Sequence, residues 1–173
     1  MWRSGAAGLR EMSEEPLIRD ALARDVERVV EIWIGFLDFH ARLDPRFARK
    51  AGSEREFAQH LERRLAEEDC LLLVAEVEEG VVGYLNGELG SYPPCFAQTA
   101  HGVIQDLAVD PPWQRRGIGT ALLQAAMVWF QRKGVPAVET GVLAKNPLAT
   151  GFWKRAGFEP YMQTFRGFTG LRE

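Results

Sequence analysis

A loop with two glycines and two adjacent arginines is the segment whose residue types point most directly to chemistry. It reads Gln114-Arg115-Arg116-Gly117-Ile118-Gly119, and it follows an apolar run and opens a helix predicted over about residues 116–133. The N–H groups of a first helical turn have no partner within the helix, so they attract anions. Cations at this end are disfavoured by about 0.3–1 kcal/mol each, and a bound polyphosphate would reverse that sign. The alternative is an ordinary glycine turn with solvated arginines.

The spacing of these residues does not fit two common phosphate-binding motifs. A P-loop needs a Lys directly after its second Gly, and this segment has none. The dinucleotide-binding fingerprint needs a third Gly beyond Gly119, where Ala121-Leu122 stands. A second block carries Asn146, Ala149 and Trp153, whose spacing places them on one face of a predicted helix.

Together the two blocks resemble the GNAT superfamily of N-acetyltransferases. The loop matches the pattern Gln/Arg-x-x-Gly-x-Gly/Ala, and the segment Asp106-Leu107-Ala108-Val109-Asp110-Pro111 before it looks like the family's fourth strand. The second block, Asn146-x-x-Ala149-x-x-x-Trp153-x-x-x-Gly157-Phe158, is similar to the family's Asn-x-x-Ala-x-x-x-Tyr-x-x-x-Gly-Phe. The resemblance covers about residues 16–168.

The resemblance implies a site for acetyl-CoA as co-substrate. Two cysteines outside any CxxC pair and only three histidines predict no metal site. Backbone N–H groups at the start of the helix would hold the pyrophosphate, while the backbone of Leu107 and Val109 would pair with the pantetheine arm. Asn146 would hydrogen-bond that arm, and the helix face with Ala149 and Trp153 would line its other side. The implied cofactor-binding residues are Leu107, Val109, Gln114, Arg115, Arg116, Gly117, Ile118, Gly119, Thr120, Asn146, Ala149 and Trp153.

Trp153 stands where the family often has a tyrosine that protonates the departing CoA thiolate. An indole N–H does not titrate in water, so Trp153 cannot replace that acid, although it can donate a hydrogen bond to the sulfur. The alternative is that Trp153 packs beside Phe152. Three tyrosines elsewhere are candidates for the missing phenol: Tyr84, Tyr92 and Tyr161.

Acetylation of an amine also needs a base, because the free amine and not the ammonium is the nucleophile. Asp106 is the first candidate, since the resemblance places it on the strand beside the acetyl group, and Glu88 on the preceding strand is the second. The alternatives are a loop-capping Asp106 and a solvated Glu88. Glu139 and His101 are weaker candidates. The predicted catalytic set is therefore Asp106, Glu88 and Trp153.

The acceptor is expected between the first helices and the hairpin that follows them. One hypothesis is an amine-binding wall, and the other is that its aromatic members form the buried face of the first helix; the residues are Trp33, Phe36, Asp38, Phe39, His40 and Asp44. The net charge of −3 suits a cationic small-molecule or peptide amine and argues against nucleic acid as a partner.

Two functions remain open at this point. One is an N-acetyltransferase that moves the acetyl group directly in a ternary complex, because neither Cys70 in its apolar run nor Cys95 in its loop looks like an acyl carrier. The other is a non-catalytic acyl-CoA-binding or sensing module, which the missing tyrosine would explain.

The elements that must position these residues follow from periodicity and turn signals. Strands are expected at about 16–21, 70–77, 81–89, 101–109, 136–143 and 158–168, and helices at about 25–39, 54–68, 116–133 and 146–156. Glu78-Glu79-Gly80 predicts a hairpin, and Ser53 with Glu56 predicts a capping box. We expect an α/β (α+β) fold with a GNAT-like mixed, mainly antiparallel sheet flanked by helices.

Residues 14–173 are expected to form one domain after a loose tail over residues 1–13. No apolar run reaches the roughly 18 residues of a membrane span, and no signal-peptide core is recognisable. We therefore expect a cytoplasmic protein without a membrane partner. An exposed edge strand near the C-terminus would suit pairing with a second copy, so a homodimer stays open.

Overall fold

The computed structural model describes residues 15–167 and 169 of the 173-residue chain. The predicted tail, residues 1–13, lies outside these described residues. The chain divides into two compact units, of which the first ends at Gly141 and the second begins at Val142. The expectation of a single domain over residues 14–173 stays a prediction.

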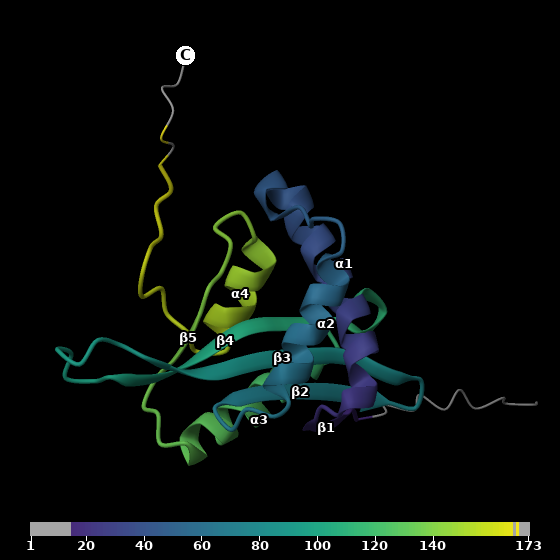
Figure 1. Cartoon of the computed structure of the whole chain (residues 1–173), viewed down its shortest axis with the longest axis horizontal. Coiled ribbons are helices and arrows are strands. Elements are labelled where there is room, and N and C mark those ends of the chain that lie inside the picture. The colour runs from purple at the N-terminus through teal and green to yellow at the C-terminus, as the bar shows by residue number, and fades with distance from the viewer. Residues whose placement is uncertain (1–14, 168, 170–173) are drawn as a thin grey trace, which may run out of the picture. The chain divides into compact units, whose positions relative to one another are not determined.

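A five-stranded mixed sheet forms the centre of the first unit (Figure 1). Its strands lie side by side in sequence order: β1 (Leu17–Asp20), β2 (Cys70–Val77), β3 (Gly80–Ser91), β4 (Ala100–Val109) and β5 (Val138–Thr140). Neighbouring strands are antiparallel except for β4 and β5, which run parallel. The predicted mixed, mainly antiparallel sheet flanked by helices is confirmed, although β5 is shorter than expected.

Helices cover both faces of this sheet (Figure 1). On one face lie α1 (Val26–Leu43) and α2 (Ser53–Arg64), which bury an apolar core that includes Val29, Leu61 and the ring of Tyr84. On the other face lies α3 (Ile118–Arg132). Short 3-10 turns occur at Ala23–Asp25, Pro45–Phe47 and Pro111–Trp113.

Helix α2 differs from its prediction at both ends. Gly52, with a φ of 79°, precedes the first turn, and its carbonyl accepts the N–H of Glu56 at 3.4 Å. The predicted capping box is therefore wrong, because Ser53 is already the first helical residue and cannot cap it. At the other end the helix stops at Arg64, four residues early, and the chain turns into β2.

Helix α3 approaches the sheet so closely that one strand position excludes any side chain. A Cβ atom at Gly102 in β4 would lie 2.5 Å from Cδ1 of Phe130, whose ring is buried. No real Cβ contact is that short, so glycine at this position is what lets α3 lie at its observed distance.

Strand β4 contains one residue more than β3 over the same length. Asn86 pairs with Asp106, whereas the next residue, Gly87, pairs with Ile104, so Gln105 is left over as a β-bulge. Because side chains alternate between the faces of a sheet, the extra residue reverses the alternation. Ile104 shares the α3 face with Gly87, whereas Asp106 shares the α1–α2 face with Asn86.

The described part of the second unit contains one helix, α4 (Pro147–Arg155). Oδ1 of Asn146 accepts the N–H of Ala149 at 3.0 Å and caps this helix. The buried ring of Trp153 lies between those of Phe152 and Phe158, with centroid distances of 5.1 and 4.9 Å.

The predicted final strand is wrong over residues 158–167, which contain no strand; residue 168 lies outside the description. Pro160 has no N–H to contribute to a ladder, and Tyr161 and Phe165 are exposed. Among the described residues, no helix combines the length and the apolar character that crossing a bilayer requires.

Candidate active site

The edge of β4 that faces away from β3 is open over its second half. β5 pairs with β4 only at residues 102–104, and no described strand continues along that edge to Val109. An open edge offers backbone N–H and C=O groups to an extended ligand. One group is already engaged, because the carbonyl of Val109 accepts the side-chain amide of Gln114 at 2.8 Å. The predicted pairing of Leu107 and Val109 with a pantetheine arm stays a prediction.

The glycine loop follows directly and has an uncommon backbone. Arg115 has a φ of 60° and Gly117 a φ of 85°, both in the left-handed region. A few per cent of non-glycine residues adopt this conformation, and such strained residues cluster at ligand sites. Alternation of left- and right-handed residues turns successive N–H groups into one concavity, which binds anions.

Helix α3 begins at Ile118, two residues later than predicted. Arg115 and Arg116 are therefore loop residues outside its first turn, and both are exposed. The guanidinium of Arg116 lies over the ring of Trp113, 4.9 Å from its centroid. The unpartnered N–H groups of the first turn, from Ile118 onward, and the two cations border the same loop, a donor set that fits a pyrophosphate.

Asp106 and Glu88, the two predicted bases, lie on the α1–α2 face of the sheet. Nδ2 of Asn86 donates to Oδ2 of Asp106 at 3.4 Å. Burial raises the pKa of Asp106, and the Asn86 hydrogen bond together with the charges of Arg64 and His40 opposes that rise. A carboxylate whose pKa is moved toward neutrality is better matched to general-base catalysis.

Glu88 is tied into a different set of contacts. Its Oε2 accepts from Nη1 of Arg64 at 2.6 Å, and its Oε1 accepts from Nε2 of Gln105 at 2.7 Å. Sequence reasoning missed Arg64 and Asn86, because an arginine in the last turn of a helix and an asparagine in a strand carry no motif. The structure brings both of them next to Asp106 or Glu88.

The candidate phenols and the weaker base candidates fall into separate places. The hydroxyl of Tyr84 is fully buried and has no partner in the described part of the chain, and burial with the nearby Asp106 charge raises its pKa well above the usual range. The hydroxyl of Tyr92 donates to Glu139, and its ring stacks on His101 with centroids 4.1 Å apart. Tyr161 is exposed in the second unit.

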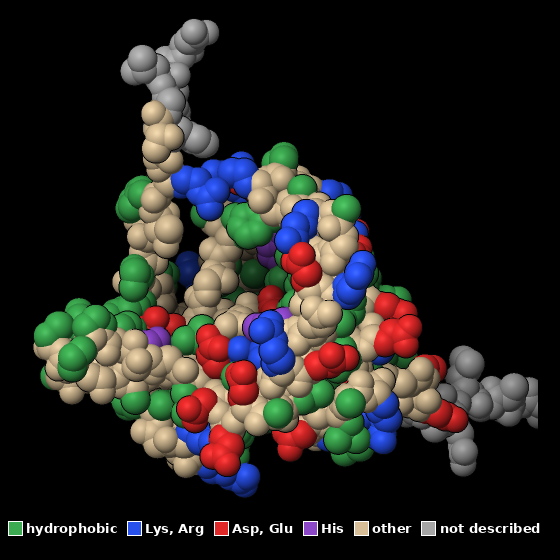
Figure 2. All heavy atoms as spheres, in the orientation of Figure 1, with side chains coloured by type: hydrophobic (Ala, Val, Ile, Leu, Met, Phe, Trp, Pro, Cys, Tyr) green, Lys and Arg blue, Asp and Glu red, His purple; other side chains and the backbone are tan. Residues whose placement is uncertain are grey.

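The cluster formed by Tyr92, His101 and Glu139 lies at the base of the projecting hairpin of β3 and β4. Figure 2 shows hydrophobic side chains gathered on the tip of this hairpin, where Phe96 is exposed. Glu139 and His101 are thereby joined to each other through Tyr92, and neither contacts Asp106 or Glu88 in the hydrogen bonds described above.

Both carboxylates of the predicted amine-binding wall are already paired with arginines. Oδ1 of Asp38 accepts from Nε of Arg49 at 3.0 Å, and the buried Asp44 forms an ion pair with Arg46. The aromatic members pack along α1 and against α2: the ring of Trp33 stacks on Phe57 with centroids 4.1 Å apart, while Phe36 and Phe39 each contact the ring of His40.

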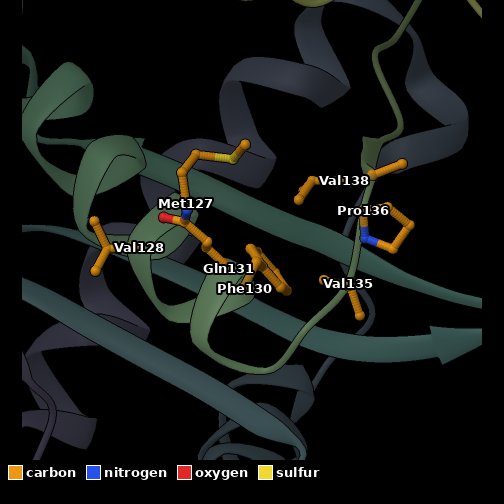
Figure 3. Close-up of a pocket in the computed structure, with 8 residues that line it drawn as sticks. Met127, Val128, Phe130, Gln131, Val135, Pro136 and Val138 are labelled. Carbon is orange, nitrogen blue, oxygen red and sulfur yellow. The ribbon is translucent and has the colours of Figure 1, made fainter.

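A further pocket, of about 330 Å³, lies at the far end of α3 from the glycine loop (Figure 3). Its walls come from the last turns of α3 and the segment leading into β5, with Met127, Phe130, Val135 and Val138 among the lining residues. The lining is mainly apolar and lacks a charged side chain. This pocket therefore does not provide the polar contacts that a polyphosphate needs.

Comparison with known proteins places this geometry in a defined group. Residues 33–158 match the acetyltransferase (GNAT) family. Over 56 residues the chain is 43% identical to an uncharacterized N-acetyltransferase of Methanocaldococcus jannaschii. The aligned segment is 32% of this chain and only 25% of that relative.

Solved structures with the same fold include three from different bacteria. A mutant of the BH1408 protein of Bacillus halodurans is 24% identical, with a TM-score of 0.80 over 87% of this chain and 97% of that one. A predicted acetyltransferase of Clostridium acetobutylicum, solved with acetyl-CoA, is 16% identical, with a TM-score of 0.72 over 88% and 96%. An aminoglycoside antibiotic 6'-N-acetyltransferase of Acinetobacter haemolyticus is 17% identical, with a TM-score of 0.71 over 90% and 99%.

Proposed function

The chain belongs to the acetyltransferase (GNAT) family, and on that premise we propose that it transfers the acetyl group of acetyl-CoA to the primary amine of a small molecule. The transfer is direct, within a ternary complex. The observation that carries the proposal is the adjacency of two features in the first unit, the open edge of β4 and the left-handed loop before α3.

Each of these features suits one part of acetyl-CoA. The open edge of β4 suits the pantetheine arm, whose amides alternate donors and acceptors as a peptide strand does. The loop and the first N–H groups of α3 suit the pyrophosphate, with the side chains of Arg115 and Arg116 contributing charge. The hydrogen bond from Gln114 to Val109 joins the loop to the end of the strand, so the two parts of the site are adjacent.

Acetyl-CoA supplies a thioester, whose C–S bond breaks as the amine nitrogen bonds to the acetyl carbon. The proton that the ammonium must lose goes to Asp106, which faces the acceptor side of the sheet because of the Gln105 bulge. The CoA thiolate then takes a proton from solvent. Trp153 contributes no proton, since its indole N–H does not titrate.

The acceptor we propose is a cationic small-molecule amine. The −3 net charge favours it, and so do the carboxylates of Asp106 and Glu88 on the acceptor side. The Acinetobacter haemolyticus protein with the same fold is named as an aminoglycoside antibiotic 6'-N-acetyltransferase, which supports a small-molecule amine.

The test is an amine panel assayed with acetyl-CoA by release of free thiol, beside thermal denaturation with and without CoA. We expect stabilisation by CoA and turnover of at least one polyamine or amino sugar. Asp106→Asn should lower kcat/KM by about 10²–10⁴-fold, the usual contribution of a positioned base, while the matched variant Asp20→Asn, an exposed carboxylate on β1, should not.

Three results would count against the proposal. Stabilisation without turnover on any amine would leave a binding or sensing module instead of an enzyme. A lack of stabilisation even at high CoA concentration would refute the cofactor site. Full activity of Asp106→Asn across the pH range would refute the assigned base.

A further inference from the structure

Arg64, the last residue of α2, has a buried guanidinium that serves three consecutive residues of β3. Nε donates to Oδ1 of Asn86 at 2.8 Å, and Nη2 donates to the carbonyl of Gly87 at 2.6 Å. Nη1 donates to Oε2 of Glu88 at 2.6 Å. The Arg64 side chain is only 4% exposed. Burial of a charge at this depth is tolerated only when its donors are paired, so the contacts hold Arg64 and β3 in one arrangement.

This arrangement decides which way the amide of Asn86 points. A guanidinium has donors only, so the group of Asn86 that faces Arg64 must be its oxygen. The amide NH₂ therefore faces β4, where it donates to Oε1 of Gln105 at 3.2 Å and to Oδ2 of Asp106 at 3.4 Å. Asn86 is 1% exposed, so water does not compete for its amide.

We propose that Arg64 is a positioning residue for acyl transfer, which acts through Asn86 by keeping an N–H donor on the carboxylate of Asp106. The proposal rests on the function proposed above, in which Asp106 is the base. Without Arg64 the amide of Asn86 is free to rotate, and its oxygen can then face the carboxylate. Two facing oxygens disfavour the ionised form, so Asp106 would hold its proton to a higher pH.

Other groups also bear on the ionisation of Asp106. His40 from α1 and Arg64 itself favour the carboxylate through their charge, and the hydroxyl of Tyr84 from β3 lies in the field of Asp106. The direct charge of Arg64 and its action through Asn86 change the ionisation in the same direction. The variant Asn86→Leu separates these two effects, because it removes the amide of Asn86 and keeps the guanidinium of Arg64.

The experiment uses the full-length chain and four variants, with two measurements on each. One is the pH profile of kcat/KM with acetyl-CoA and the panel amine that the wild type acetylates fastest. The other is a ¹³C NMR titration of the Asp106 carboxyl carbon, which needs no turnover. The variants are Arg64→Gln, Arg64→Lys, Asn86→Leu and the control Arg63→Gln, whose exposed side chain donates only to Gln59 of its own helix among the contacts described.

We expect Asn86→Leu and Arg64→Gln to move the Asp106 titration and the acid limb of kcat/KM to higher pH. Near neutral pH, kcat/KM should fall about tenfold and recover on the alkaline side, which is a fraction of the 10²–10⁴-fold that a positioned base contributes. Arg64→Lys keeps a donor-only cation and should restore part of the loss. Arg63→Gln should leave both measurements unchanged, and the KM for acetyl-CoA should be constant throughout.

An unshifted Asp106 titration in Asn86→Leu overturns the proposal, whatever the activity shows. The same holds if Arg63→Gln shifts it as much. If Arg64→Gln does not fold, Arg64→Lys and Asn86→Leu decide the matter. A shifted titration together with full activity of Asp106→Asn would instead refute the assigned base and leave the arrangement around Asp106 standing.

Discussion

Gly117→Ala offers a sharp test of the proposed phosphate loop, because helix α3 provides its own control. Gly117 precedes the helix with a φ of 85°, and Gly134 follows it with a φ of 76°. A Cβ at either position would meet nothing within 4 Å. The two alanine variants therefore share one defect, left-handed backbone without steric contact, at opposite ends of one helix.

The cost of that defect is about 1–2 kcal/mol for a residue with a Cβ. For a chain of this size, 1 kcal/mol corresponds to about 2–4 °C in the melting temperature, so both variants should melt a few degrees below the wild type. At Gly117 the strain is relieved by rotating the loop N–H groups away from the phosphates. CoA affinity should then fall by about 5–30-fold, the factor that corresponds to 1–2 kcal/mol.

Isothermal titration calorimetry with CoA, beside thermal denaturation of the free proteins, measures both effects. We expect a weaker Kd for Gly117→Ala only, with similar melting temperatures for the two variants. An unchanged Kd for Gly117→Ala would refute the loop as the phosphate site. An equal loss in Gly134→Ala would show that helix stability, and not the loop, controls binding.

Three further predictions concern packing, thiol reactivity and acid stability. Gly102→Ala should lower the free energy of unfolding by about 1–3 kcal/mol, because the added methyl group overpacks against the ring of Phe130 in α3. An unchanged urea midpoint would contradict the close approach of α3 to β4. A maleimide should label the exposed Cys95 quickly at neutral pH and Cys70 slowly, because burial raises the pKa of the Cys70 thiol to about 11; Cys95→Ser should then abolish the fast phase. Arg19 holds the pKa of Asp25 below its usual range, so the stability this adds is present above the unfolded pKa and lost as the pH falls through the folded one. Urea unfolding of Asp25→Asn should accordingly show a deficit at neutral pH that disappears in acid, and a deficit independent of pH would refute the ion pair as its cause.

Local signals in the sequence were enough to predict most elements of the first unit. The hairpin of β2 and β3 follows from the short Glu78-Glu79-Gly80 connection, and the length of α3 follows from apolar spacing and its glycine stop. The loop at 114–119 could be singled out because its two glycines and two arginines lie within six residues. Such features need no knowledge of which strands are neighbours.

Features that depend on pairing between distant segments could not be predicted. The bulge at Gln105 is defined by how β4 pairs with β3, and a glutamine in a strand carries no local signal that predicts it. Arg64 reaches Asn86 because α2 ends beside β3, and this proximity depends on the tertiary structure. The capping box at Ser53 failed because an adjacent glycine in the left-handed region offered the helix another start.

The Gln105 bulge also determines how this gene tolerates small insertions and deletions. Loss of its single codon would remove the residue that has no partner in β3, so that Ile104 and Asp106 would become neighbours and still pair with Gly87 and Asn86. Because Ile104 faces α3, uninterrupted alternation would keep the carboxylate of Asp106 on the α1–α2 face beside Asn86. An in-frame deletion of this codon would thus leave the proposed base in place, whereas a regular pairing of Gln105 would turn Asp106 toward α3 and the apolar surface around Phe130. Length changes at the exposed hairpin tip between β3 and β4 also leave the register on either side intact.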